Sequence, residues 1–175
     1  MKTLLAFILF ALSSLTYVNA MDNKTIRIST KDTDLILQVG ENGRLYQTYL
    51  GEKLLHEQDL QHFQWNIHAG SDGSVSKRGW EVYSGSGNED FFEPAISITH
   101  HDGNPSTILY YVSSSDKAVE GGTETTILLR DDRYPVEVTL HYIAYPKENI
   151  IKTWSEIRHQ EKKPVTLSSL SLIHI

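Results

Sequence analysis

His100-His101-Asp102 places two imidazoles next to a carboxylate, and both groups are ordinary ligands of zinc. The pattern argues against a metal site all the same. Asp102-Gly103 is typical of a hairpin turn, and adjacent residues on a strand point to opposite faces of a sheet. The other histidines show neither an i, i+4 spacing on a helix nor an H-E-x-x-H arrangement. We therefore expect no metal site and no cofactor. The remaining histidines, such as His56, His62, His68, His141 and His159, are expected at the surface or paired across strands.

No group of residues in the sequence predicts catalysis. Gly85-Ser86-Gly87 is too short to match the G-x-S-x-G nucleophile elbow, and it lacks the strand–turn–helix context of that motif. A retaining glycosidase needs two carboxyl groups about 5–5.5 Å apart. Asp131-Asp132 are neighbours at a predicted turn, where exposure to solvent accounts for two charged residues. The simplest role of Glu89-Asp90 is hydrogen bonding within their own loop. We expect no catalytic residue.

A stretch rich in glycine and serine runs from Gly70 to Glu93, and aromatic residues are interleaved in it. Long loops in compact domains are often functional, and aromatic rings can stack on sugars. Aromatic residues of a sandwich lie more often in the core, so both interpretations stay open. The substrate-contact candidates are Trp80, Tyr83, Asp90, Phe91 and Phe92.

The composition excludes several classes of protein. A chain of 175 residues with 39% hydrophobic residues fits one globular domain by the usual range of roughly 100–200 residues. The formal net charge of −6 provides no basic surface for a nucleic acid. The absence of cysteine excludes a disulfide framework, a thiolate metal site and a cysteine nucleophile.

The elements that position these residues are predicted to be strands. From Thr25 onward, short segments of alternating polarity are divided by turn residues, which is typical of an antiparallel all-β domain. The clearest alternation places Val136, Val138, Leu140 and Tyr142 on one face. With eight or more such segments, we expect an antiparallel β-sandwich.

Residues 1–20 have the order of parts of a secretory signal peptide. Lys2 precedes an apolar run, and Val18-Asn19-Ala20 supplies a cleavage site before Met21. A membrane anchor needs about 20 continuous apolar residues, whereas Ser13-Ser14 interrupts this run. We expect a periplasmic or secreted product that leaves the membrane after cleavage.

The order of motifs from Ile26 to about Leu167 resembles the N-terminal domain of glycoside hydrolase family 36, the α-galactosidase family, and particularly its exported Bacteroides-type members. No single motif is diagnostic, and the order in which they occur carries the resemblance. The matching segments are 43–51 (GRLYQTYLG), 80–83 (WEVY), 90–96 (DFFEPAI), 100–104 (HHDGN), 109–111 (LYY), 126–131 (TILLRD) and 136–142 (VEVTLHY).

The resemblance implies a large, supersandwich-like β domain that is followed in the family by a (β/α)8 barrel. The family's retaining mechanism uses one aspartate as nucleophile and a second as acid/base, both at the C-terminal face of the barrel, where barrel enzymes keep their chemistry. This chain has no aspartate after Asp132, so no catalytic role transfers to it. The implied substrates of the parent protein are terminal α-galactosides of oligosaccharides, and a homo-oligomer of the full-length enzyme is its expected assembly.

In some family members, a loop of the sandwich helps to form the wall of the active site, sometimes that of a neighbouring subunit. Residues 80–94 are the corresponding loop in this sequence. A common form of the family motif reads Asp-Phe-Arg, whereas this chain reads Asp90-Phe91-Phe92. The substitution removes the arginine that could make a charged contact with sugar.

The sequence predicts three segments: a signal peptide at 1–20, an incomplete N-terminal β-sandwich domain at 21–169 and a tail at 170–175. The last six residues resemble the translation of a transposase adapter used in DNA library preparation, so we expect an incomplete gene read whose genuine sequence ends near Ser169. Two other functions stay open. One is a free-standing carbohydrate-binding β-sandwich, and the other is an exported structural or adhesive sandwich without affinity for sugar.

Overall fold

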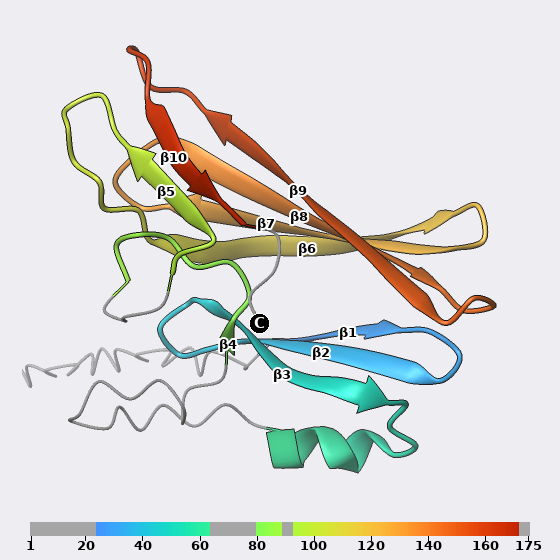
Figure 1. The fold of residues 1–175 in the computed structure, drawn as a ribbon. Coiled ribbons are helices and arrows are strands. Elements are labelled where there is room, and N and C mark those ends of the chain that lie inside the picture. Colours follow the sequence, from blue (N-terminus) through green and yellow to red (C-terminus); the bar gives the residue numbers. More distant parts are fainter. Residues whose placement is uncertain (1–23, 64–79, 89–92, 172–175) are drawn as a thin grey trace, which may run out of the picture.

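Two layers of antiparallel strands make up the protein, whose computed structural model describes residues 24–63, 80–88 and 93–171. In Figure 1 the sheet that contains β1, β2 and β3 lies below the long sheet of β6 to β9, and the pair β5 and β10 lies at one end. None of the helices in the described ranges is long and apolar enough to cross a membrane.

Hairpins build the lower sheet. Its strands, in sheet order, are β1 (Thr25–Ser29), β2 (Thr33–Val39), β3 (Leu45–Glu52) and β4 (Trp80–Glu81). Asn42-Gly43 lies in the turn between β2 and β3, as expected from this dipeptide, which is the strongest short hairpin signal in a sequence. Gly43 has a φ of 75°, a left-handed value that glycine adopts without a clash of Cβ. The short 3-10 helix η1 (Glu57–Phe63) follows β3.

The upper sheet is a meander in which each strand pairs with the next. Its strands are β6 (Leu109–Val119), β7 (Gly122–Asp131), β8 (Val136–Tyr145) and β9 (Ile150–His159). The predicted alternation along β8 is confirmed, since Val136, Val138, Leu140 and Tyr142 are all buried while the residues between them are partly exposed. This face of β8 therefore points into the core.

β5 and β10 form a separate two-stranded sheet. β10 (Thr166–Leu170) runs antiparallel to β5 (Ile96–Thr99), and the N–H of Ser171 donates to the carbonyl of Ala95. Beyond β4, Gly85 forms a parallel bridge with Ile96. Hydrogen bonding therefore continues from the lower sheet through residues 84–85 to β5 and β10.

The core fills the space between the layers. Leu37 of the lower sheet, Ile96 of β5, and Ile127 and Val138 of the upper sheet are all completely buried and belong to one apolar cluster. Complete burial of one such side chain stabilises the fold by about 1.5–3 kcal/mol. The predicted antiparallel β-sandwich is confirmed. Its apolar core packs β5 against the upper sheet.

Candidate functional site at the stem of the 80–94 loop

The five predicted substrate contacts belong to the 80–94 loop, of which the structure describes a part. Asp90, Phe91 and Phe92 lie outside the described residues. The backbone of Trp80 forms β4, and its side chain is also outside the description. Sugar contacts by these four residues stay predictions. Residues 84–88, which we call the loop stem, are described and show how the loop is held.

Tyr83 is a core residue immediately before the loop stem. Its side chain is 4% exposed and packs in the apolar cluster between the layers, with its hydroxyl 3.4 Å from Oγ of Ser155 in β9. Burial raises the pKa of the Tyr83 hydroxyl, and the hydrogen bond with Ser155 offsets only part of this effect. The ring joins the two layers and presents almost no surface on which a sugar could stack. The burial of Tyr83 therefore argues against a sugar contact, which stays a prediction.

An ion pair in the lower sheet holds the end of the loop stem through Asn88. Glu81 in β4 accepts hydrogen bonds from Nε and Nη2 of Arg44, the first at 3.1 Å, and from Nδ2 of Asn88 at 2.6 Å. The Arg44 and Glu81 side chains are only 18% and 7% exposed, so solvent ions screen the pair weakly. Because Asn88 ends the loop stem, the pair fixes where the loop leaves the sheet.

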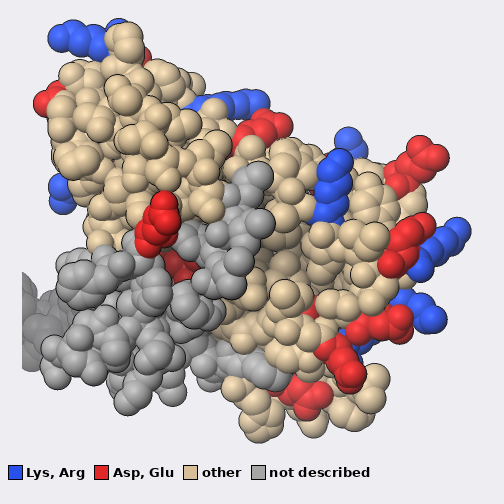
Figure 2. Space-filling view, in the orientation of Figure 1, with Lys and Arg blue, Asp and Glu red and all other residues tan. Residues whose placement is uncertain are grey.

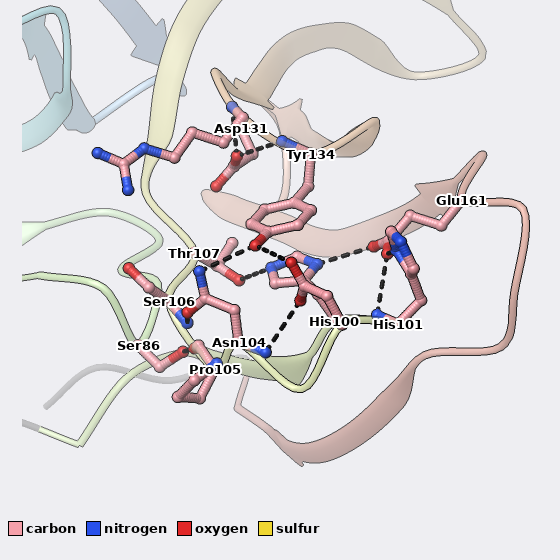
Figure 3. Close-up of polar contacts among 12 residues, drawn as sticks. Ser86, His100, His101, Asn104, Pro105, Ser106, Thr107, Asp131, Tyr134 and Glu161 are labelled. Carbon is pink, nitrogen blue, oxygen red and sulfur yellow. Dashed lines mark hydrogen bonds and ion pairs between the residues drawn. The ribbon is translucent and has the colours of Figure 1, made fainter.

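The loop stem packs directly on the segment that leads into β6. The N–H of Gly87 donates to the carbonyl of Thr107 at 2.9 Å. The hydroxyl of Ser86 donates to the carbonyl of Pro105 (Figure 3). Gly85 approaches so closely that a Cβ atom there would lie 2.1 Å from the same Thr107 oxygen. On its other side, the carbonyl of Ser84 accepts the N–H of Ile96 at 3.1 Å. The loop stem is thus held between β5 and residues 105–108.

Thr107 also belongs to a cluster that we call the polar hub, which consists of His100, His101, Thr107, Tyr134 and Glu161 (Figure 3). Nε2 of His100 lies 3.0 Å from Oγ1 of Thr107, and Nδ1 of His100 lies 2.7 Å from Oε1 of Glu161. The His100 ring is stacked on Tyr134 with a centroid separation of 3.5 Å. The three loops that follow β5, β7 and β9 therefore meet around one imidazole.

Glu161 is the anion of the polar hub. Its side chain is 1% exposed, and it accepts hydrogen bonds from Nδ1 of His100, from Nδ1 of His101 at 2.6 Å and from the backbone N–H of His101 at 3.1 Å. Burial by itself would raise the pKa of Glu161, but these hydrogen bonds outweigh it and lower the pKa to about 2. The carboxylate is therefore charged at neutral pH.

Tyr134 connects the polar hub to the surface. Its hydroxyl donates to Oδ2 of Asp102 at 2.9 Å and accepts from Nδ2 of Asn104 at 2.9 Å. A backbone hydrogen bond from Asn104, together with the Tyr134 hydroxyl, lowers the pKa of Asp102. Desolvation and the Asp102 carboxylate raise the pKa of Tyr134. Oδ1 of Asp131 accepts the backbone N–H of Tyr134 at 2.8 Å and so fixes the turn that carries the ring.

Comparison with protein-family models now identifies the fold. The model described as glycosyl hydrolase family 36 N-terminal domain matches residues 43–175. The chain belongs to glycosyl hydrolase family 36. No curated protein matches the chain. The polar hub and the loop stem both lie within the residues that match the family 36 domain.

Solved structures share the fold of this family 36 domain at low sequence identity. The α-galactosidase of Lactobacillus brevis aligns with a TM-score of 0.68 at 18% identity, over 85% of this chain and 23% of that one. AgaA of Geobacillus stearothermophilus gives 0.67 at 22%, over 84% and 24%. The galactosidase domain of AgaSK gives 0.69 at 21%, over 86% and 24%. Variants of AgaA have been solved with raffinose and with stachyose. The chain spans about a quarter of the length of these structures.

The family 36 domain arranges His100 and His101 differently from the sequence prediction. We predicted that adjacent histidines on a strand point to opposite faces. β5 ends at Thr99, so both histidines lie beyond the strand, and both Nδ1 atoms reach Glu161. Within residues 24–63, 80–88 and 93–171, no group of three or more His, Asp or Glu side chains is placed to hold a metal ion.

Sequence reasoning missed Glu161 and Tyr134 entirely. Tyr134 lies in the turn between β7 and β8, and Glu161 lies in the turn between β9 and β10. Neither residue is separated from His100 by a helical or strand period. The sequence signal for the polar hub was the composition of the two turns, because each turn contains a residue that can contact an imidazole. The pairing of β5 with β10 brings the turn of Glu161 next to His100, and the pairing of Leu109 with Asp131 brings the turn of Tyr134 there.

Proposed function

We propose that this chain is the leading, non-catalytic part of an exported, retaining α-galactosidase that hydrolyses terminal α-galactosides of oligosaccharides. The observation that carries the proposal is the family 36 match over residues 43–175. The fold shared with several α-galactosidases supports it, including AgaA variants solved with raffinose and stachyose. In this proposal the sandwich is a scaffold, and the nucleophile and the acid/base aspartates belong to a barrel encoded further along the gene.

The decisive experiment recovers the genomic continuation and assays the whole protein. We expect the sequence to continue into alternating strands and helices, with aspartates at the ends of barrel strands. The purified full-length protein should release galactose from raffinose and stachyose. NMR of the first product should show the α-anomer, as retention requires. A continuation without a barrel, or a full-length protein inactive on every α-galactoside, would refute the proposal.

The 175-residue chain is the control for this assay. We expect it to release no galactose, because no catalytic aspartate lies within it in this proposal. Titration of the same chain with raffinose and with galactose tests the other function, a free-standing carbohydrate-binding module. Tight binding by the isolated chain, lost on replacement of Trp80, would favour that module over a scaffold.

Export is the second part of the proposal. Residues 1–20 carry the signal-peptide pattern of a basic start, an apolar run and a small-residue cleavage site before Met21. Expression of the native gene in a Gram-negative host should yield protein in the periplasm or medium, with Met21 as the first residue by N-terminal sequencing. A matched variant with Leu9→Arg in the apolar run should stay inside the cell at its full length.

A further inference from the structure

We propose that His100 and Thr107 position the stem of the 80–94 loop, and that Glu161 holds His100 in the orientation this requires. The chemistry of the loop toward sugar rests on the proposed function, whereas the positioning is a property of this chain alone. The structural observation is that Thr107 touches both partners: its hydroxyl meets His100, and its carbonyl accepts the N–H of Gly87.

The contact between the loop stem and Thr107 is too close to be incidental. Gly85 and Gly87 both lie against the Thr107 carbonyl oxygen. A Cβ atom added at Gly85 would lie 2.1 Å from this oxygen, and one added at Gly87 would lie 2.9 Å from it. Only glycine fits at both positions. A shift of the Thr107 peptide would therefore move the loop stem with it, because the stem has no side chain at these positions that could take up the change.

His100 controls the orientation of the Thr107 side chain. The Thr107 residue is completely buried, and its Oγ1 lies 3.0 Å from Nε2 of the buried His100 ring. A ring that carries its proton on Nδ1 donates to Glu161, and its Nε2 is then free to accept the Thr107 hydroxyl. Glu161 thus selects the tautomer and the orientation that Thr107 needs.

His101, the residue after His100, holds the Glu161 carboxylate in place. The second oxygen of Glu161 accepts from Nδ1 and from the backbone N–H of His101, so the carboxylate cannot turn away from His100 without losing two hydrogen bonds. Tyr134 stacks on the His100 ring and keeps it from swinging out of the hub. The chain of contacts runs from Glu161 through His100 and Thr107 to Gly87.

Amide hydrogen exchange of the 175-residue chain, followed by NMR, tests this inference. The test variant is Thr107→Val, which keeps the shape and the carbonyl but removes the hydroxyl. The matched control is Thr107→Ser, which keeps the hydroxyl. Loss of a buried hydrogen bond should raise the exchange rate of the Gly87 amide about tenfold in the valine variant and much less in the serine variant. Amides of β7 and β8 should keep their rates.

Two variants of His100 separate its two hydrogen bonds. His100→Asn places its amide nitrogen where Nδ1 lies, so it can reach Glu161 but not Thr107, and His100→Gln extends toward Thr107 instead. We expect rapid exchange at Gly87 in the asparagine variant and slower exchange in the glutamine variant. The inference is overturned by an unchanged Gly87 rate in both Thr107→Val and His100→Asn, or by a rise that β7 and β8 share equally, because that would show only a loss of global stability.

Failure of this inference and failure of the proposed function have different signatures. The exchange experiment needs neither sugar nor catalysis, so an inactive full-length protein would leave its result intact. Conversely, an unchanged Gly87 rate in an active α-galactosidase would remove the positioning role and leave the proposed function standing.

Discussion

The imidazole of His100 lies flat on the phenol ring of Tyr134, with the ring centroids 3.5 Å apart and an angle of 7° between the planes. The two residues come from different loops, and each ring is also hydrogen bonded at its polar atoms. A stacked pair whose polar atoms are also hydrogen bonded limits the motion of both loops. Polar contacts therefore stabilise this end of the sandwich in addition to the apolar core.

Stability at acid pH should depend on Glu161. Because the pKa of Glu161 in the folded protein is about 2, below its ordinary value of 4.5, its contribution to stability is complete above about pH 4.5. The contribution is lost as the pH falls from about 4.5 to 2. Urea unfolding between pH 2 and 7 should show a steeper loss in the native protein than in Glu161→Gln. Asp132→Asn, at an exposed turn carboxylate, is the control and should follow the native curve.

Tyr134 should stabilise the loops through two separable contacts. Tyr134→Phe removes the hydroxyl that meets Asp102 and Asn104 but keeps the stack on His100, so we expect a small loss in the free energy of unfolding. Tyr134→Ala also removes the stack and should cause a larger loss. Urea titration at pH 7 measures both values. Equal losses in the two variants would show that the stack contributes nothing.

Two glycines should differ in their response to alanine. Gly85 has no room for a Cβ, which would lie 2.1 Å from the Thr107 oxygen, so Gly85→Ala should destabilise the protein by about 2–3 kcal/mol. Gly103 has a φ of 89° with open space around it, so Gly103→Ala should cost only about 1 kcal/mol of backbone strain. Thermal unfolding of the pair gives the comparison. The reverse order would contradict the packing of the loop stem on Thr107.

Tyr83 should behave as a core residue. Tyr83→Ala leaves a cavity between the layers, and we expect a loss of about 3–5 kcal/mol. Tyr83→Phe removes only the 3.4 Å contact with Ser155 and should cost less than about 1 kcal/mol. Urea unfolding distinguishes the two variants. In the proposed full-length enzyme, a loss of substrate affinity in Tyr83→Phe at unchanged stability would show that the hydroxyl contributes to sugar binding.

Local patterns in the sequence predicted much of the sandwich. The alternation of β8 and the turn at Asn42-Gly43 are visible because strand period and turn chemistry are properties of neighbouring residues. The polar hub could not be predicted in this way. Glu161 reaches His100 only because β10 returns to pair with β5, and strand pairing over such a separation leaves no periodic trace in the sequence.

Tyr83 shows a different limit of sequence reasoning. An aromatic residue beside a glycine-rich loop can stack on a ligand or pack in the core, and composition alone does not separate the two. Its burial follows from the course of residues 82–85, which continue from β4 toward the bridge of Gly85 with Ile96 and turn the Tyr83 ring toward β9.

The bridge between Gly85 and Ile96 has an evolutionary consequence. It joins the loop stem to the start of β5, so the segment between Gly85 and Ile96 is closed at its base by backbone hydrogen bonds. The entropy of closing a loop grows only slowly with its length. Loop residues that follow Asn88 can therefore be exchanged or inserted in evolution while the sandwich keeps its form.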